Sequence, residues 1–399
     1  MLNKNTLLYL LSNSFTVFCS NMIQFLLAVY VLKETKSATL YSIMLSIIVV
    51  PRLFVSPLAG VISDKINKLF LMRICLLLYF FSYSLFSVIE IFQDSIYIIL
   101  TIVLLLEIIE IFYTSANTSM IPILSSEDSI AKITSISVTM ESISNILAPV
   151  VGAICLSLIG FHYSLFFTSI ISGICLIFFL FIRENNYLSH QIRESTIQML
   201  IEAITIIKND HFIFSVILIA PIINFFLATL LTITYVYYLN TIMGVSPLLY
   251  GIFEGGCGVS AIVGGIVATI VIDNRNHLKT LYDSLKIIAL IIFLQIFIIT
   301  ITIPQNLAFT LFFISAILVN ISLMVMNTAT SVTIKRIINV DYMGRITMII
   351  NLLATIALPI GQLLYGKLAD KYPSSIAFLL TDAGLIFAIF LLKRRIIHE

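Results

Sequence analysis

Several charged side chains fall inside long apolar stretches of the chain, and five of them are the leading candidates for chemistry. They are one guanidinium, Arg52, and four carboxylates, Glu107, Glu110, Glu141 and Glu254. A charge inside a bilayer is costly, so such residues are candidates for function by default. A carboxylate held away from water can take up and release a proton, which is the chemistry that couples transport to a proton gradient. We therefore expect these four carboxylates to bind protons or another cation.

Arg52 offers one of these carboxylates a partner. Counted from the ends of their apolar runs at about 1.5 Å per residue, Arg52 and Glu107 reach similar depths, and Glu110 lies roughly 5 Å deeper. An ion pair between Arg52 and Glu107 is therefore expected, either as a structural staple or as part of a proton-linked switch. Glu141 has no partner that its spacing reveals. Glu254 begins the stretch Glu254-Gly-Gly-Cys-Gly258, where glycines allow a helix to bend.

The composition around these residues is that of a membrane protein. The 399 residues are 60% hydrophobic and 11% charged, with a mean hydropathy of +1.11, which excludes a soluble enzyme. The 22 basic and 20 acidic residues leave no basic surplus to bind nucleic acid. The five cysteines form no CxxC pair and the histidines lack ligand spacing, so we expect no disulfide, no metal site and no cofactor.

The elements that must position the charges are transmembrane helices, each needing about 20 apolar residues. Twelve apolar runs are found at 7–32, 39–61, 69–92, 96–117, 133–159, 163–182, 212–239, 247–272, 281–302, 307–332, 346–366 and 374–392. The fold class expected is therefore an all-α integral membrane protein. A polar stretch divides it into an N-terminal six-helix bundle (1–182), a cytoplasmic linker (183–210) and a C-terminal six-helix bundle (211–399). In the linker, Ile197, Leu200, Ile201, Ile204 and Ile207 recur at helical spacing and predict an amphipathic helix on the cytoplasmic leaflet.

Lysine and arginine predict the orientation. If both termini are cytoplasmic, the outside loops hold only Lys33, Lys36, Lys367 and Lys371, and every other basic residue except Arg52 falls on the inside. This bias predicts a multi-pass protein of the cell membrane with both termini in the cytoplasm. The first apolar run is much longer than a cleavable signal region, so we expect a retained first helix.

The two halves share an internal repeat. Residues of the first half recur in the second at a nearly constant offset of 209 or 210: Tyr41 and Tyr250, Asp64 and Asp273, Pro149 and Pro359, Gly152 and Gly361. The equivalent positions have the same inside or outside sense, so the duplication is parallel. Two six-helix bundles related by a pseudo-two-fold axis along the membrane normal are typical of transporters that rock one half against the other.

A loop motif follows the second apolar run. The segment Gly60-Val-Ile-Ser-Asp64-Lys65-Ile-Asn67-Lys68 resembles the motif G-x-x-x-D-R-x-G-R of the major facilitator superfamily. The small Gly60 would allow close helix approach, and Asp64 with Lys65 and Lys68 would latch the halves on the cytoplasmic side. The alternative is a basic loop that only sets the topology.

The fifth apolar run contains a second motif. Its segment Ser144-Asn-Ile-Leu-Ala148-Pro149-Val-Val-Gly152-Ala153 resembles the antiporter motif G-x-x-x-G-P-x-x-G-G of the same superfamily. Ala148 and Gly152 are small enough for close backbone contact, and Pro149 kinks the helix. Because the motif is associated with exporters, the resemblance favours efflux over uptake.

Other segments resemble the macrolide-efflux branch of twelve-helix drug/proton antiporters. They are Pro51-Arg52-Leu-Phe-Val-Ser-Pro57-Leu-Ala-Gly60, Met120-Ile-Pro122 and Met343-Gly344-Arg345. Many members carry an arginine in helix 4 that is linked to proton coupling. This chain has Leu106, Glu107 and Glu110 in that region, which puts coupling by the usual residue in doubt.

In this superfamily, helices 1, 4, 7 and 10 line most of the substrate cavity. The resemblance therefore implies a cavity lined by Asn13, Asn21, Gln24, Tyr113, Asn117, Asn224, Phe225, Asn320, Met324 and Asn327. Apolar walls with a few amides suit a bulky amphiphile. The alternative is that these amides join helices to one another.

These observations together predict a transporter and no enzyme. The expected function is proton-coupled efflux of a hydrophobic or amphiphilic small molecule, as in drug resistance, by a monomer whose partners are its substrate, protons and the lipid bilayer. Two alternatives stay open. One is a proton symporter for a nutrient, and the other is a transporter-like immunity or sensor protein that no longer cycles.

Overall fold

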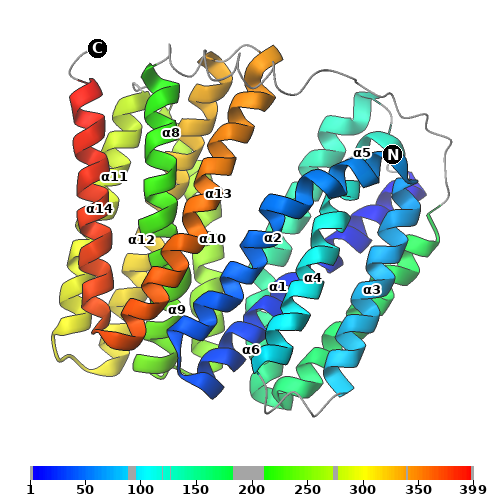
Figure 1. Cartoon of the computed structure of the whole chain (residues 1–399), viewed down its shortest axis with the longest axis horizontal. Helices are drawn as coiled ribbons and strands as arrows, with labels where there is room; N and C mark the ends of the chain where they lie inside the picture. The colour runs from blue at the N-terminus through cyan, green and yellow to red at the C-terminus, as the bar shows by residue number, and fades with distance from the viewer. Residues whose placement is uncertain are drawn as a thin grey trace. The chain divides into compact units, whose positions relative to one another are not determined.

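The protein is all-helical in a computed structural model that describes residues 3–88, 96–118, 120–125, 127–182, 211–272, 277–337 and 340–396 (Figure 1). No strand occurs within these ranges. The linker 183–210, with the amphipathic helix expected there, lies outside the described residues, as does Asp273. The predicted division at 182 and 211 stays a prediction.

The helices follow the apolar runs, because a backbone in lipid must satisfy its own hydrogen bonds. In chain order they are α1 (Lys4–Thr35), α2 (Ala38–Lys65), α3 (Lys68–Val88), α4 (Ile96–Asn117), α5 (Met120–Leu124), α6 (Glu127–Leu180), α8 (His211–Ile223), α9 (Tyr235–Tyr237), α10 (Pro247–Ile272), α11 (His277–Thr300), α12 (Gln305–Ile337), α13 (Val340–Lys371) and α14 (Ser374–Ile396). Between α8 and α10 lie the π-helical turns η2 (Asn224–Ala228), η3 (Leu230–Thr234) and η4 (Tyr238–Ile242).

Two elements differ from the apolar runs that predict them. Eleven helices within the described residues are long and apolar enough to span a bilayer. One of them, α6, contains both the fifth and the sixth predicted runs, joined at Gly160 with φ 79° and ψ 177°. Glycine adopts a positive φ readily, so the chain turns at Gly160 between two helical segments that follow each other directly.

The seventh run contains the other difference. It extends as one span over Phe214–Ile242, but three of its turns are π-helical. In such turns the backbone bonds reach one residue further, as from Met243 N–H to the Tyr238 carbonyl at 2.7 Å. Hydropathy reports length and apolarity, so it does not distinguish this winding from an ordinary α-helix.

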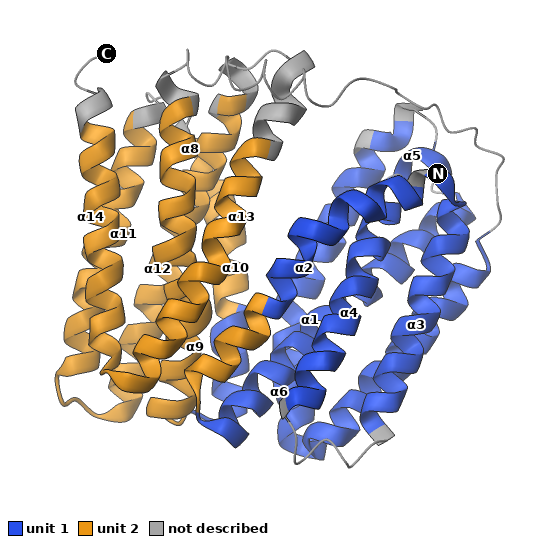
Figure 2. Ribbon diagram, in the orientation of Figure 1, with its two compact units in different colours: residues 1–36, 47–191, 245–255 blue, residues 37–46, 192–244, 256–399 orange. Residues whose placement is uncertain are grey.

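The described chain forms two compact units (Figure 2). Unit 1 comprises Met1–Lys36, Ile47–Gln191 and Val245–Gly255, and unit 2 comprises Ser37–Ser46, Ile192–Gly244 and Gly256–Glu399. Unit 2 therefore contains the first part of α2, and unit 1 contains the rest of that helix. Conversely, unit 1 contains the first part of α10, and unit 2 contains the rest.

Unit 1 is built around α1, which packs along α6 and is the most buried of the spanning helices. In unit 2, α11 packs against α12 and α14, and α13 packs against α8 and η2. The core of unit 2 is aromatic: Tyr235 packs against Phe312 and stacks on Phe378 with ring centroids 5.7 Å apart. Large apolar side chains elsewhere are exposed, such as Phe54 and Leu158, as expected for helices surrounded by lipid.

Candidate functional site

Arg52 of α2 and Glu107 of α4 form an ion pair in unit 1. The Arg52 Nε donates to Glu107 Oε1, and Nη2 lies 3.3 Å from Oε2, so the guanidinium contacts both carboxylate oxygens. The Glu107 side chain is 4% exposed, whereas that of Arg52 is 47% exposed. The guanidinium favours the ionised form of this carboxylate, because protonation would leave the guanidinium without its counter-charge.

Glu110 lies one turn further along α4 and has a neutral partner. Its Oε2 accepts a hydrogen bond from the hydroxyl of Tyr79 on α3. Tyr79 is 2% exposed, and its ring stacks on that of Tyr83 with centroids 5.6 Å apart. Sequence reasoning missed Tyr79 because it is one of several aromatic residues in an apolar run, and nothing in its spacing singles it out.

Glu141 of α6 has partners that its spacing did not reveal. Its Oε1 accepts hydrogen bonds from Asn13 Nδ2 of α1 at 2.8 Å and from Ser137 Oγ at 3.0 Å. The other side of the Asn13 amide accepts a bond from the Tyr113 hydroxyl of α4 at 3.1 Å. Asn13 and Tyr113 are almost fully buried. Glu141 thus ends a chain of neutral hydrogen-bonding groups that joins three helices.

A polar seam between α1 and α6 positions Glu141. Ser137, Glu141 and Asn145 follow one another at intervals of four, which places them on one face of α6. On α1, Asn21 donates to Asn145 Oδ1 at 2.7 Å. Ser144 Oγ donates to the Ser14 carbonyl at 2.9 Å. Interhelical hydrogen bonds of this kind hold helices together where lipid provides no hydrophobic driving force.

The residues that resemble the antiporter motif continue this seam. Ala148 is fully buried, and a Cβ added at Gly152 would lie 3.1 Å from the Phe25 ring of α1. On the other side, a Cβ added at Gly251 of α10 would collide with Ala153 and lie 3.0 Å from the Pro149 carbonyl oxygen. The motif therefore brings α6 into close contact with α1 and with the first part of α10.

Glu254 lies in that first part of α10, also within unit 1. Its Oε1 accepts a hydrogen bond at 2.7 Å from the hydroxyl of Tyr250, one turn earlier on the same helix. The Tyr250 ring stacks on Phe25 of α1 with centroids 5.3 Å apart. Within the described part of the chain, no lysine or arginine forms an ion pair with Glu110, Glu141 or Glu254.

The residues predicted to line a cavity belong to both units and have different neighbours. In unit 1, Asn117 accepts a bond from Tyr9 at 2.8 Å, and Gln24 is exposed. In unit 2, Asn224 and Asn320 donate to carbonyls of their own helices, each at 3.0 Å, and Phe225 packs on Phe226. Met324 and Asn327 are exposed. The cavity expected from these residues stays a prediction.

The loop motif lies between α2, which ends at Lys65, and α3, which begins at Lys68. Asn67 Oδ1 accepts a bond from the Phe70 backbone N–H at 3.1 Å, so Asn67 caps α3. A Cβ added at Gly60 would meet nothing within 4 Å among the described residues, so the close helix approach expected there stays a prediction. The side chain of Asp64 is outside what the structure describes, and the latch stays a prediction.

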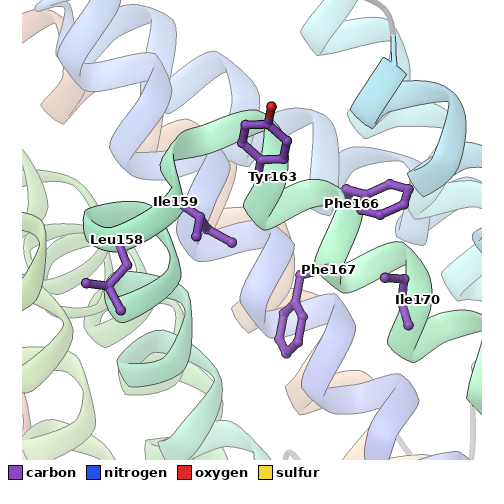
Figure 3. Close-up of a pocket in the computed structure, with 6 residues that line it drawn as sticks. All are labelled: Leu158, Ile159, Tyr163, Phe166, Phe167 and Ile170. Carbon is purple, nitrogen blue, oxygen red and sulfur yellow. The ribbon is translucent and has the colours of Figure 1, made fainter.

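The surface of α6 has a pocket of about 550 Å³, and none of the carboxylates described above lines it. Figure 3 shows its lining residues on either side of the turn between Ile159 and Tyr163. Leu158, Phe166, Phe167 and Ile170 complete the lining, and the Tyr163 hydroxyl is its one polar side-chain group. Because Leu158 and Tyr163 are mostly exposed within a membrane-length helix, we assign this pocket to the lipid-facing surface.

The sequence profile of the Major Facilitator Superfamily matches residues 9–362. The chain belongs to the Major Facilitator Superfamily. It is therefore a multi-pass membrane transporter of the secondary type and no member of an enzyme family. No curated protein sequence matches it.

Solved transporters of this superfamily share the fold. The nucleoside transporter NupG has a TM-score of 0.77 and 14% identity, and the match covers 98% of this chain and 99% of that one. A bacterial homologue of the iron transporter ferroportin, in an inward-facing state, has a TM-score of 0.73, 12% identity, and 98% and 97% coverage. A bacterial homologue of the human lysosomal transporter Spinster has a TM-score of 0.68, 12% identity, and 98% and 94% coverage.

Proposed function

We propose that this transporter exports hydrophobic or amphiphilic small molecules against an inward flow of protons, by alternating access. The observation that carries the proposal is Glu141, a carboxylate on the α1–α6 seam whose partners among the described residues, Asn13 and Ser137, are neutral. Glu141 lies about two helical turns before Pro149, and Pro149 belongs to the segment that resembles the exporter motif.

Neutral partners suit a group that must exist in two protonation states. The ionised Glu141 accepts bonds from both Asn13 and Ser137. When Oε1 is protonated, it can donate the new O–H to the Ser137 hydroxyl, which rotates to accept it, and a lone pair of the same oxygen remains for the Asn13 amide. The same exchange of donor and acceptor is open to Glu110 and Tyr79. A proton can therefore bind and leave without an unpaired cation remaining in the membrane.

Glu107 has a different role in this proposal. Its ion pair with Arg52 opposes protonation, so we assign the pair to holding α2 against α4. Glu110, Glu141 and Glu254 then carry the proton-binding role, with Glu141 the main candidate. This division also accounts for a proton-coupled cycle without an arginine in helix 4.

The substrate class follows from the amides and aromatic groups that the superfamily resemblance assigns to the cavity. No pair of basic residues occurs among them, which disfavours phosphate esters. Apolar and aromatic walls with a few amide groups suit a macrolide or another bulky amphiphile. The resemblance of segments such as Met120-Ile-Pro122 to the macrolide-efflux branch supports this choice.

Transport into everted membrane vesicles tests the proposal. With the vesicle interior acidified, a radiolabelled macrolide and a fluorescent lipophilic dye should accumulate, and an ionophore that collapses the pH gradient should release them. Vesicles without the protein are the control. If neither compound accumulates in response to the gradient, export of this class is wrong. Proton-dependent accumulation only in right-side-out vesicles would instead favour the nutrient symporter.

The substitution Glu141→Gln tests the coupling residue. Glutamine keeps the shape and the hydrogen bonds to Asn13 and Ser137 but cannot change its charge, so gradient-driven accumulation should fall to the background level. Exchange of labelled for unlabelled substrate without a gradient should persist. Glu34→Gln, at an exposed acid near the end of α1, is the matched control and should transport normally. Gradient-driven transport by Glu141→Gln with an unchanged pH profile would remove Glu141 from the mechanism.

A further inference from the structure

The segments that the two compact units exchange are equivalents in the internal repeat. Ser37–Ser46, the start of α2, belongs to unit 2, and Val245–Gly255, the start of α10, belongs to unit 1. The two segments are offset by about 209 residues, the same offset that relates Tyr41 to Tyr250. Each segment thus packs on helices from the opposite half of the sequence (Figure 2).

The contact made by α10 is apolar. Gly251 has no space for a Cβ against Ala153, and a Cβ added at Gly255 would lie 2.7 Å from Val150 Cγ2 of α6. Small residues stabilise a helix crossing because they let the two backbones approach closely and make many dispersion contacts. The carboxylate in this segment, Glu254, bonds Tyr250 of its own helix, and among the described residues no hydrogen bond or ion pair links it across the crossing to α6.

The contact made by α2 has the same tight packing and adds a carboxylate. A Cβ added at Gly366 of α13 would collide with Ser42, which is fully buried. One turn further along α13, Asp370 accepts three hydrogen bonds from Ser37, which directly precedes α2, and from the first two residues of that helix. They come from Ser37 Oγ at 2.8 Å, Ala38 N–H at 2.6 Å and Thr39 N–H at 3.0 Å.

The local backbone explains why Asp370 fits there. Lys36 adopts a left-handed conformation with φ 50°, and its N–H bonds the Leu32 carbonyl, so α1 ends and α2 begins within two residues. The first N–H groups of a helix have no partners within it, and its dipole favours a negative charge at that end. Asp370 supplies both needs from a distant part of the sequence. The position 209 residues earlier is Phe161, so this charge has no equivalent at the other crossing.

We propose that Asp370 is a positioning residue for transport: its carboxylate fastens the first turn of α2 to α13 in one conformation, and the bonds to it must break for the other conformation to form. This inference rests on the alternating access proposed above. The α10 crossing can separate when apolar surfaces slide, whereas the α2 crossing must also release three hydrogen bonds to a charge. Asp370 therefore sets the balance between the two conformations.

Hydrogen–deuterium exchange of the full chain in lipid nanodiscs tests this inference. In Asp370→Asn, the amides of 37–46 should exchange roughly fivefold faster or more, as expected for the loss of a helix cap. The amides of 247–255, which Asp370 does not touch, should also exchange faster, because both crossings open together when the halves move. The connection between α2 and α3 should exchange more slowly as the opposite side closes.

Two further variants make the result decisive. Glu34→Gln removes a nearby exposed negative charge that makes no bond to α2, and it should leave every segment unchanged. Ser37→Ala removes one of the three bonds and should shift all segments in the same directions by less. Faster exchange confined to 37–46, or no change at all, would overturn the inference and make Asp370 a local cap.

The measurement also separates this inference from the proposed function, because it uses no substrate. If neither the macrolide nor the dye accumulates in vesicles but the exchange pattern shifts in both segments, the role of Asp370 stands and the export proposal fails. If both compounds are transported and faster exchange stays confined to 37–46, the export proposal stands and the role of Asp370 fails.

Discussion

Glu107 and Glu110 lie one turn apart on α4 but have different partners. Arg52 contacts Glu107, and the Tyr79 hydroxyl contacts Glu110. The charge of the partner decides what each carboxylate can do, since a cation favours the ionised acid, whereas a hydroxyl can donate to the ionised form or accept from the protonated form. The depths of Arg52 and Glu107 along their apolar runs predicted the first pair, whereas the Tyr79 partner of Glu110 is visible only in the structure.

A double-mutant cycle tests the role assigned to the ion pair. Arg52→Gln should lower the free energy of unfolding by about 2 kcal/mol, because Glu107 would then be buried without a counter-charge and Arg52 is itself half exposed. The double variant Arg52→Gln with Glu107→Gln should recover much of that loss. Thermal unfolding in detergent measures the effect. Equal losses from the single and double variants would contradict a structural pair.

At the scale of elements, α6 joins the carboxylate seam of unit 1 to several neighbouring helices. It packs against α1 and α3, carries Glu141, and receives the start of α10 on its small residues. The motif Ala148-Pro149-Val-Val-Gly152 predicted close contact by this helix, and the structure shows with which helices. The partner surface on α10 depends on Gly251, which sequence reasoning did not single out, and on Gly255, which it noted only within a stretch where the helix could bend.

Two glycines of α10 give a matched prediction for this contact. Gly251→Ala should lower the midpoint of thermal unfolding, because its Cβ would collide with Ala153, and overpacking costs about 1–3 kcal/mol. Gly265→Ala lies on the same helix with nothing within 4 Å and should be neutral or slightly stabilising. If the two variants unfold at the same temperature, the close packing of α10 on α6 is wrong.

At the scale of the whole molecule, the distribution of lysine and arginine predicts the orientation. A fluorescent protein fused to the C-terminus should fluoresce in a bacterial host, and alkaline phosphatase fused there should be inactive, because both report a cytoplasmic end. Fusion after Lys371 should reverse both results, since the predicted outside loop holds Lys367 and Lys371. Active phosphatase at the C-terminus would contradict the predicted topology.

The exchange of segments between the compact units is a property of the whole chain that no local pattern indicates. The repeat showed that Tyr41 and Tyr250 occupy equivalent positions. It did not show that each begins a helix that packs on the opposite half, because a repeat relates positions without specifying their contacts. The hydrogen bond from Ala38 to Asp370 joins residues 332 apart in sequence.

The sequence by itself determined the membrane class, the spans, the repeat and the few charges within the apolar runs. It could do so because spanning a bilayer requires about 20 apolar residues whatever the later packing, and because the cost of a buried charge makes each one conspicuous. Only the tertiary structure decided the partners of Glu110 and Glu141, the π-helical turns after α8, and the contact of Asp370 with α2. These depend on which helix faces become neighbours, and in lipid that choice is made by close packing and hydrogen bonds between helices, which hydropathy does not record.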